Sequence, residues 1–149
     1  MIETRRKQPV IDECHCFMMR RAARRMTQFY DDMLAPVGLR VSQFSLLALV
    51  NELGTPTINE MAELLELDRT TAGKNLRPLE RSGHVVTLRS EKDGRSRVTK
   101  LTEKGRATLK EASILWREAQ RMYEAVNGRD AIDGLERELA AVEIPAVGP

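Results

Sequence analysis

Basic and hydrogen-bonding side chains gather between residues 68 and 104. That segment holds ten basic and five acidic side chains, whereas residues 41–67 hold four acidic and no basic ones. The whole chain of 149 residues, with 24 basic and 22 acidic side chains, is close to neutral. Positive charge confined to one segment indicates an anionic partner more clearly than the total does. We therefore expect this segment to bind a polyanion.

The side chains suited to a DNA duplex fall into two groups, one on a predicted helix and one on a predicted hairpin. Arginine and lysine bind guanine edges and phosphates, and threonine contacts thymine methyl groups or phosphates. The candidate DNA-contacting residues are Arg69, Thr70, Thr71, Lys74, Asn75 and Arg77 on the helix, and Arg89, Lys92, Arg95 and Arg97 on the hairpin. Any one of them alone is more often a solvated surface residue, so it is the combination that favours DNA binding.

The closely spaced thiols Cys14 and Cys16 form a second constellation. Residues two apart on a continuous helix point about 200° apart, so two such thiols do not easily bridge each other or hold one ion together. Three interpretations stay open: small helix residues without a sensing role, a redox sensor with disulfides across a dimer, or a soft-metal or arsenic site completed by a partner subunit. The spacing is not that of a structural zinc site. Two cysteines also make no disulfide framework, which fits a reducing, cytoplasmic compartment.

Catalytic motifs are not visible in the sequence. It contains no glycine-rich phosphate loop, no H-E-x-x-H and no G-x-S-x-G pattern. His15 and His84 are the only histidines, and His84 opens the predicted hairpin, where packing or phosphate contact is a more common role than general-base catalysis. We therefore expect no enzymatic activity, no cofactor and no resident metal.

Apolar periodicity places the thiols on a long helix. Apolar residues recur at steps of three and four over 11–33, which predicts one helix that Pro36 and Gly38 end. A second helix is expected over 43–53, with Ser42 as its N-cap. Its centre is apolar nearly all round, which is typical of a helix buried on most sides.

The candidate DNA-contacting helix follows a short third helix. Thr57 and Glu60 have the spacing of a capping box for that third helix. Asp68 is then a suitable N-cap for a fourth helix that extends to Arg81. Pro78 lies inside the fourth helix at a cost of about 3 kcal/mol, so other contacts must hold this helix together.

Residues 84–101 change to the period of strands. Strands are expected over 84–89 and 96–101, joined by a turn over 91–94 that contains Asp-Gly, the strongest hairpin dipeptide. A long fifth helix starts after Thr102, and Asn127-Gly128 ends it. A last helix carries the narrow apolar seam of paired helices, made by Ile132, Leu135, Leu139 and Val142. Residues 1–9 are expected to be a loose arm, and the tail 145–149 to be frayed.

This order of elements predicts a mainly α-helical protein with a winged helix-turn-helix. Its regions are an N-terminal arm and first helix over 1–40, a winged helix-turn-helix over 41–104, and C-terminal helices over 105–149; the resemblance described next implies that the first and last regions form a dimer and that the middle one binds DNA. The longest uncharged stretch, Val41–Asn51, has 11 residues, against about 20 for a membrane-spanning helix. No apolar segment of the kind found in secretory signals follows the N-terminus. The sequence thus predicts no membrane association.

Three segments resemble the multiple-antibiotic-resistance (MarR) family of bacterial transcription factors. Residues 93–105, DGRSRVTKLTEKG, reproduce the wing signature D-x-R-S followed by L-T-x-x-G. Residues 67–83 match the recognition-helix pattern, and residues 34–39 with 43–47 match the region before it. The resemblance covers roughly residues 11–127. It implies an obligate homodimer with interlocking first and last helices, a pseudopalindromic operator, and modulation by a small ligand or by oxidation.

The resemblance also implies roles for individual residues. Thr70, Thr71, Lys74, Asn75 and Arg77 map to the helix that faces the DNA groove, and Arg95 and Arg97 map to the wing. Asp93 maps to the wing as an anchor that pairs with a neighbouring arginine, because a carboxylate beside phosphates would repel them. Proline at the position of Pro78 is tolerated in some members. Arg20 and Arg24 are more simply a solvated helix face than contacts to a ligand carboxylate.

We therefore predict a homodimeric DNA-binding regulator, with repression as the expected sign because a dimer on a promoter blocks polymerase by occupancy. Its two recognition helices must lie about one DNA turn apart, roughly 34 Å. The alternative is a winged-helix module that binds protein and not DNA, which the arginines and lysines disfavour. A small enzyme is the remaining alternative, and it lacks a visible catalytic set.

Overall fold

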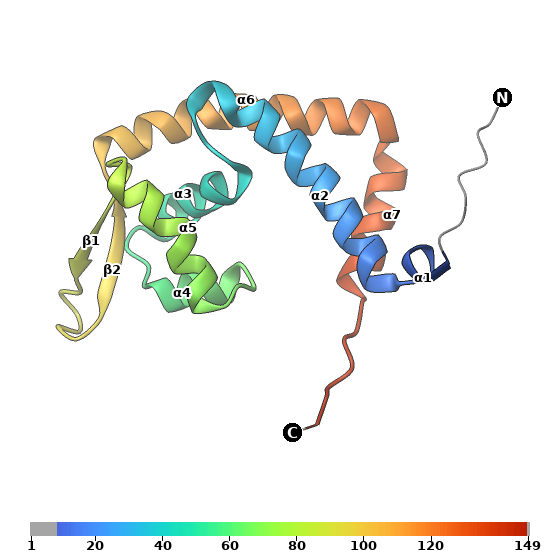
Figure 1. The fold of residues 1–149 in the computed structure, drawn as a ribbon. Coiled ribbons are helices and arrows are strands. Elements are labelled where there is room, and N and C mark those ends of the chain that lie inside the picture. The colour runs from blue at the N-terminus through green and yellow to red at the C-terminus, as the bar shows by residue number, and fades with distance from the viewer. Residues whose placement is uncertain (1–8, 149) are drawn as a thin grey trace.

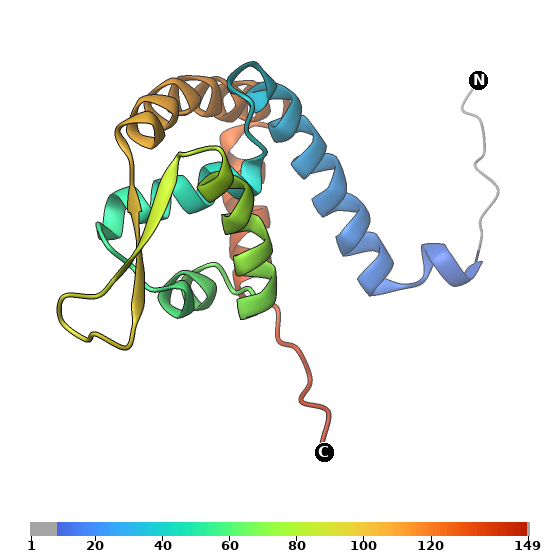
Figure 2. The ribbon, with the colours of Figure 1, turned by 60° about the vertical axis from the view of Figure 1, so that its left-hand side comes forward.

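The helices and the hairpin form a body that carries a long helical arm, as Figures 1 and 2 show. The computed structural model describes residues 9–148. Helices α3, α4 and α5 and the hairpin β1–β2 make the body, while α2, α6 and α7 extend away from it. The bounds are α1 Pro9–Asp12, α2 His15–Leu34, the 3-10 turn η1 Ala35–Val37, α3 Val41–Leu53, α4 Ile58–Leu64, α5 Arg69–Arg81, β1 Val85–Arg89, β2 Arg97–Leu101, α6 Glu103–Asn127 and α7 Arg129–Ala140. The predicted mainly helical winged fold is confirmed.

Helix α3 supplies the centre of the hydrophobic core. Leu46, Leu47 and Val50 are at most 1% exposed, and Phe44 is also buried. Because α3 is apolar nearly all round, it is stable only when other elements cover most of its surface. The rest of the buried cluster comes from those neighbouring elements: Leu34, Leu39, Met61, Leu76, Leu79, Val85, Leu101, Leu109 and Ala112.

The arm helices are joined to the body through specific contacts. The carboxylate of Asp31 on α2 accepts a hydrogen bond of 2.7 Å from the backbone N–H of Val41, the first residue of α3. Phe44 of α3 stacks on Trp116 of α6 with ring centroids 5.8 Å apart. The Tyr30 hydroxyl donates a hydrogen bond to Gln120 across α2 and α6. These contacts attach α2 to the start of α3 and to α6.

The N-terminal region differs from the single long helix that the periodicity predicts. The helical hydrogen bonds stop after Asp12, and α2 begins at His15 with Cys14 as its N-cap. The Cys14 sulfur accepts from the backbone N–H of Phe17 at 3.4 Å, and so replaces a helical partner at this end. The apolar stripe continues across the break, which explains why periodicity alone does not reveal it. The predicted arm, apart from Pro9, lies outside the described residues.

Helix α3 begins at Val41 and not after Ser42. The predicted N-cap Ser42 is therefore wrong by two positions, and Arg40 is the N-cap. The Arg40 backbone N–H donates to the Gln43 side chain at 2.9 Å. The Asp31 carboxylate accepts from the Val41 N–H. The side chains of Gln43 and Asp31 thus satisfy two backbone N–H groups at the start of α3, which have no partner within the helix.

The turn between α4 and α5 follows the predicted caps. Thr57 and Glu60 form the expected reciprocal capping box of α4. Asp68 caps α5 by accepting from the Thr71 backbone N–H at 2.9 Å. Between the helices, Glu66 has φ +50°, and the Leu67 N–H donates to the Ala62 carbonyl at 2.8 Å, which closes a tight turn.

Pro78 lies inside α5 as predicted, and tertiary packing holds the helix around it. The neighbouring side chains Leu76 and Leu79 are buried in the core. The Ser82 hydroxyl and backbone N–H both donate to the Pro78 carbonyl, at 2.8 and 3.0 Å. Burial and these end contacts offset the missing backbone donor.

The hairpin pairs antiparallel from Val85 opposite Leu101 to Arg89 opposite Arg97. The Thr99 N–H donates to the Pro56 carbonyl at 2.8 Å, so the segment before α4 lies along β2. The connecting loop is wider than the Asp-Gly turn that the sequence predicts. Gly94 does not adopt a positive φ, and the closing hydrogen bond runs from the Ser90 N–H to the Ser96 carbonyl at 2.8 Å.

Gly105 permits a close approach between α6 and the start of the hairpin. A Cβ built on Gly105 would lie 1.9 Å from the His84 carbonyl oxygen, where no side chain fits. The Thr102 hydroxyl, which caps α6, also donates to the carbonyls of Gly83 and His84. The base of the hairpin is therefore bound directly to the first turn of α6.

The C-terminal helix α7 ends at Ala140, so Val142 of the predicted seam lies beyond it. Among the described residues, no single helix is long and apolar enough to span a membrane. The segments His15–Val37 and Val41–Leu53 reach the length and apolar composition of a membrane span only when they are combined, and a bend of 70° separates them.

Candidate nucleic-acid interface

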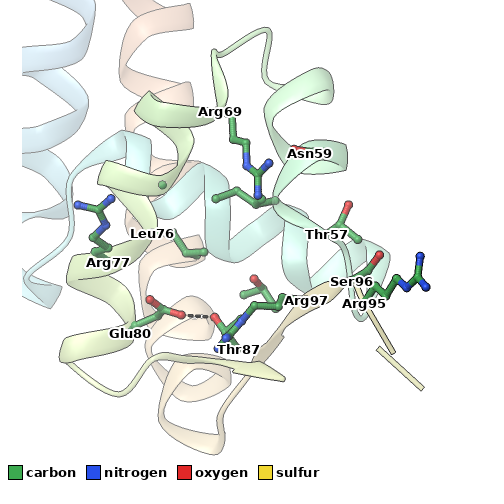
Figure 3. Close-up of a pocket in the computed structure, with 13 residues that line it drawn as sticks. Thr57, Asn59, Arg69, Leu76, Arg77, Glu80, Thr87, Arg95, Ser96 and Arg97 are labelled. Carbon is green, nitrogen blue, oxygen red and sulfur yellow. Dashed lines mark hydrogen bonds between the residues drawn. The ribbon is translucent and has the colours of Figure 1, made fainter. Parts of the chain in front are cut away.

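A groove of about 620 Å³ lies between α5 and the hairpin, and four of the predicted contact residues line it. These are Arg69, Arg77, Arg95 and Arg97. All four are exposed. Figure 3 shows α5, α4 and the hairpin surrounding this groove, with Arg97 next to Thr87 on the hairpin. The fold thus brings together cationic side chains that lie up to 28 positions apart in the chain.

The four groove arginines have no carboxylate partner among the described residues. The ion pairs within residues 9–148 are made by Arg21, Arg121 and Arg129. The one acidic residue that lines the groove, Glu80, accepts a hydrogen bond from the Thr87 hydroxyl. The groove therefore presents unneutralised positive charge to solvent, which suits an external polyanion.

The bond between Glu80 and Thr87 also orients the hairpin. Glu80 lies near the end of α5 and Thr87 lies in the middle of β1, so their contact ties the helix to the strand (Figure 3). Beneath it, Leu76 and Thr99 are buried, at 5% and 2% exposure. A packed base and one bridging hydrogen bond thus hold the two cationic edges in a fixed relation.

The remaining predicted residues of α5 divide by exposure. Thr70 and Lys74 are exposed, as expected of groups that contact a ligand. Thr71 and Asn75 are half-buried. The Thr71 hydroxyl donates to the Asp68 carboxylate at 2.5 Å, so it also serves the N-cap. That bond, with the Thr71 backbone N–H, lowers the pKa of Asp68 and keeps the cap ionised.

Arg89 and Lys92 do not line the groove, although Arg89 pairs with Arg97 across the hairpin. They line a second hollow of about 400 Å³, together with the acidic residues Glu60 and Glu91. The pKa of Glu60 is lowered, mainly by hydrogen bonds from Thr57 and to a smaller extent by the charge of Lys92. The ten predicted residues therefore do not all line one groove, and the mixed charge makes this second hollow a weaker site for a polyanion.

Asp93 is placed at the tip of the hairpin, where it organises the loop. Its carboxylate accepts from the Arg95 backbone N–H at 3.0 Å and from the Ser96 hydroxyl at 2.8 Å. Among residues 9–148 it makes no ion pair with an arginine, so the predicted pairing is replaced by a turn within the loop. The two hydrogen bonds lower the pKa of Asp93. The carboxylate therefore stays ionised at neutral pH, and these bonds weaken only as the pH falls through that lowered value.

Sequence reasoning did not predict as contacts the other nine residues that line the groove, among them Asn59, Gly73 and Ser96. Asn59 carries no distinctive sequence signal. Ser96 does, because it is the serine of the wing signature D-x-R-S. Gly73 does as well, because a glycine inside a helix lowers its stability and calls for an explanation.

Cys14 and Cys16 lie far along the chain from the groove and are both exposed. Since Cys14 precedes α2, the 200° separation expected on a continuous helix does not apply to the pair. Among the described residues, no group of three or more His, Cys, Asp or Glu side chains could hold a metal ion.

His84 lies at the base of the hairpin. Its pKa is lowered by partial burial and by the charge of Lys104, which favours a neutral imidazole.

Comparison with known proteins gives one family. The sequence model described as MarR family matches residues 37–96. An organic hydroperoxide resistance transcriptional regulator from Bacillus subtilis is 36% identical over 99 residues, which cover 66% of this chain and 67% of that protein. The regulator MosR of M. tuberculosis in complex with DNA is 37% identical, with a TM-score of 0.71 over 89% of this chain and all of that one. The repressor CouR bound to a 23-mer DNA duplex is 33% identical, with a TM-score of 0.78 over 90% of this chain and 95% of that one.

We predict that Asp93→Ala weakens binding to duplex DNA severalfold, although it removes a negative charge. Charge alone would tighten binding to phosphates, whereas loss of the two loop hydrogen bonds disorders Arg95 and its neighbours. Fluorescence anisotropy with a labelled duplex measures the effect. Glu91→Ala removes the same charge from the same loop without these hydrogen bonds, so it should bind as tightly as the unmodified protein or more tightly. Tighter binding by both variants would contradict the anchor role.

Proposed function

This chain belongs to the MarR family, and we propose from that membership that it is a homodimeric transcriptional regulator that binds a pseudopalindromic operator and represses by occupying the promoter. The observation that carries the proposal is the groove between α5 and the hairpin, whose four arginines have no carboxylate partner in the described part of the chain. Its relatives MosR and CouR, both above 30% identity, are described in complexes with DNA. We assign DNA binding to residues 41–104 and dimerisation to residues 1–40 and 105–149.

The geometry suits insertion of α5 into a major groove. A helix with its side chains is about 10–12 Å wide, close to the roughly 12 Å width of that groove in B-DNA. With Ala72, Leu76 and Leu79 buried, the exposed side of α5 presents Thr70 and Lys74 to the bases and phosphates. The narrow two-stranded hairpin then carries Arg95 and Arg97 to the minor groove or the flanking phosphates.

The protein-binding and enzymatic alternatives are disfavoured by the same surface. If the groove bound a protein, its arginines would pair with carboxylates of that protein. Substituting the arginines would then leave DNA binding unchanged. The family consists of regulators, and we propose a regulatory and not a catalytic role for this chain.

We expect affinity for an operator duplex to fall steeply as salt rises, because bound phosphates release counterions. Arg95→Ala should weaken binding and lower the slope of log affinity against log salt by about 1 if Arg95 contacts a phosphate. Arg121→Ala is the matched control, since Arg121 is exposed on α6 and pairs only with Glu118. No binding by the unmodified protein at low salt would refute the DNA-binding role and favour the protein-docking module.

Uncovered apolar side chains on the helical arm support a homodimer. They lie on α2, α6 and α7 and in the segment that follows α7: Met18, Met19, Ile114, Met122, Val126, Leu135, Leu139, Val142 and Ile144. The same three helices line an apolar groove of about 480 Å³. Apolar patches of this extent mark interaction surfaces in soluble proteins. A second copy that buries them would also set the separation of the two recognition helices.

The expected oligomeric state is a dimer at micromolar concentration by light scattering. The double substitution Leu135→Asp and Leu139→Asp places charge on half-exposed seam positions and should shift the protein toward monomer. Operator affinity should fall with it, because one recognition helix then binds one half-site alone. Leu64→Asp, at a 59% exposed position on α4, should stay dimeric. If the unmodified protein is a monomer at this concentration, the proposed binding of two recognition helices to two half-sites is wrong.

Release from the operator is proposed to occur through a small ligand or through the thiols of Cys14 and Cys16. Both thiols are exposed, and the Cys14 sulfur caps α2. An organic hydroperoxide would take two electrons and two protons from two thiols, which yields a disulfide, an alcohol and water. Because α2 contacts the first turn of α3 through Asp31, movement of α2 reaches the DNA-binding body.

We predict that an organic hydroperoxide weakens operator binding by the unmodified protein and leaves Cys14→Ser/Cys16→Ser unaffected. Serine is itself a good N-cap, so the double variant should keep α2 intact and bind the operator when reduced. Non-reducing gel electrophoresis distinguishes a disulfide within one chain from one between chains. Equal sensitivity of both proteins would exclude the thiols, and release by aromatic acids alone would assign regulation to a small ligand.

A further inference from the structure

Gly73 lies in the middle of α5, at a position where the fold itself does not require glycine. It is helical, without a positive φ, so its conformation is open to any residue. A Cβ built there would meet only the Ile58 Cδ1 atom at 3.6 Å, an ordinary van der Waals contact. Gly105 is the contrasting case, because a Cβ there would lie 1.9 Å from a backbone oxygen.

Glycine at this position has a cost. Inside a helix it is less stable than alanine, because it loses more backbone freedom on folding and adds no side-chain contact. Helix α5 already contains Pro78, a second residue unfavourable to helices. A fold selected for stability alone would therefore carry alanine at residue 73.

The position of Gly73 on the helix supplies the reason. Residues four apart share a helix face, so Gly73 lies one turn after Arg69 and one turn before Arg77. All three line the groove between α5 and the hairpin. The cationic stripe on α5 thus has a gap at its centre, where the helix backbone is open to the groove.

We propose that Gly73 is the point of closest approach between α5 and the operator, and that its missing side chain lets the helix seat against a base-pair edge. This inference rests on the proposed DNA-binding function. Arg69 and Arg77 contact the phosphates or bases on either side, and the bare backbone between them allows the helix to enter the major groove more deeply. Gly73 is therefore a positioning residue for specific recognition, while the arginines supply the charge.

The test is Gly73→Ala, compared with the unmodified protein for thermal stability and for binding to the operator and to an unrelated duplex. The melting temperature should rise by roughly 2–4 °C, because alanine favours the helix. Operator affinity should fall about tenfold or more, because the methyl group holds the helix away from the bases. Affinity for the unrelated duplex and its salt slope should change little, since phosphate contacts by the arginines dominate that binding. Gly73→Gln, with a longer side chain that also favours helix, should lose more operator affinity.

Asn51→Ala is the control. Asn51 is an exposed residue near the end of α3 that lines neither the groove nor the second hollow, and alanine favours a helix more than asparagine does. This variant should gain stability without a change in operator affinity.

Each outcome is decisive. A more stable Gly73→Ala protein with unchanged operator affinity would overturn the proposal and leave the proposed function intact. A less stable variant would overturn it as well, because glycine would then serve the fold. Absence of operator binding by the unmodified protein would instead refute the proposed function on which the inference rests.

Discussion

Burial of α3 on nearly every side is the constraint on which the rest of the structure depends. A helix whose apolar side chains point in all directions needs neighbours all round, and α2, α4, α5, α6 and the hairpin provide them. The Phe44–Trp116 stack and the Asp31 contact to the start of α3 connect this core to the arm. The elements proposed to face DNA and the elements proposed to pair with a second copy are therefore packed on one shared helix. A change at either end must be accommodated by the other, because a close-packed core does not deform gradually.

The groove beside α5 carries features that do not stabilise the fold. Four arginines gather there without a carboxylate partner among residues 9–148, although like charges repel. A glycine also occupies a helix interior where alanine would be more stable. At the same time, the base of the groove is tightly determined by the Glu80–Thr87 bond and by buried Leu76 and Thr99. A rigid support beneath an unneutralised surface is the arrangement expected of a binding site, since its groups are held in position before the ligand arrives.

Local chemistry explains which predictions succeeded. Thr57, Asp68 and Thr102 cap their helices as their sequence context indicates, because a capping side chain contacts a backbone N–H only two or three residues away. The sequence did not predict the break before α2 and misplaced the start of α3, because the contacts that determine them are not standard local caps. The cap of α2 is a cysteine sulfur, which is not a standard cap. The first turn of α3 is capped by Asp31, ten residues earlier and on another helix. Asp93 was correctly placed on the hairpin, but its partners are a backbone N–H and a serine hydroxyl, where an arginine side chain was predicted.

The sequence by itself determined the type and order of the elements and the family, because periodicity, caps and the wing motif are local patterns. It also identified the segment that carries the positive charge. Only the tertiary structure decided which of those charges act together. It placed Arg69, Arg77, Arg95 and Arg97 around one groove and Arg89 and Lys92 in another hollow with acidic neighbours. The physical reason is that the direction of a side chain on α5 or the hairpin depends on how these elements pack against α3, and that packing joins residues far apart in the chain.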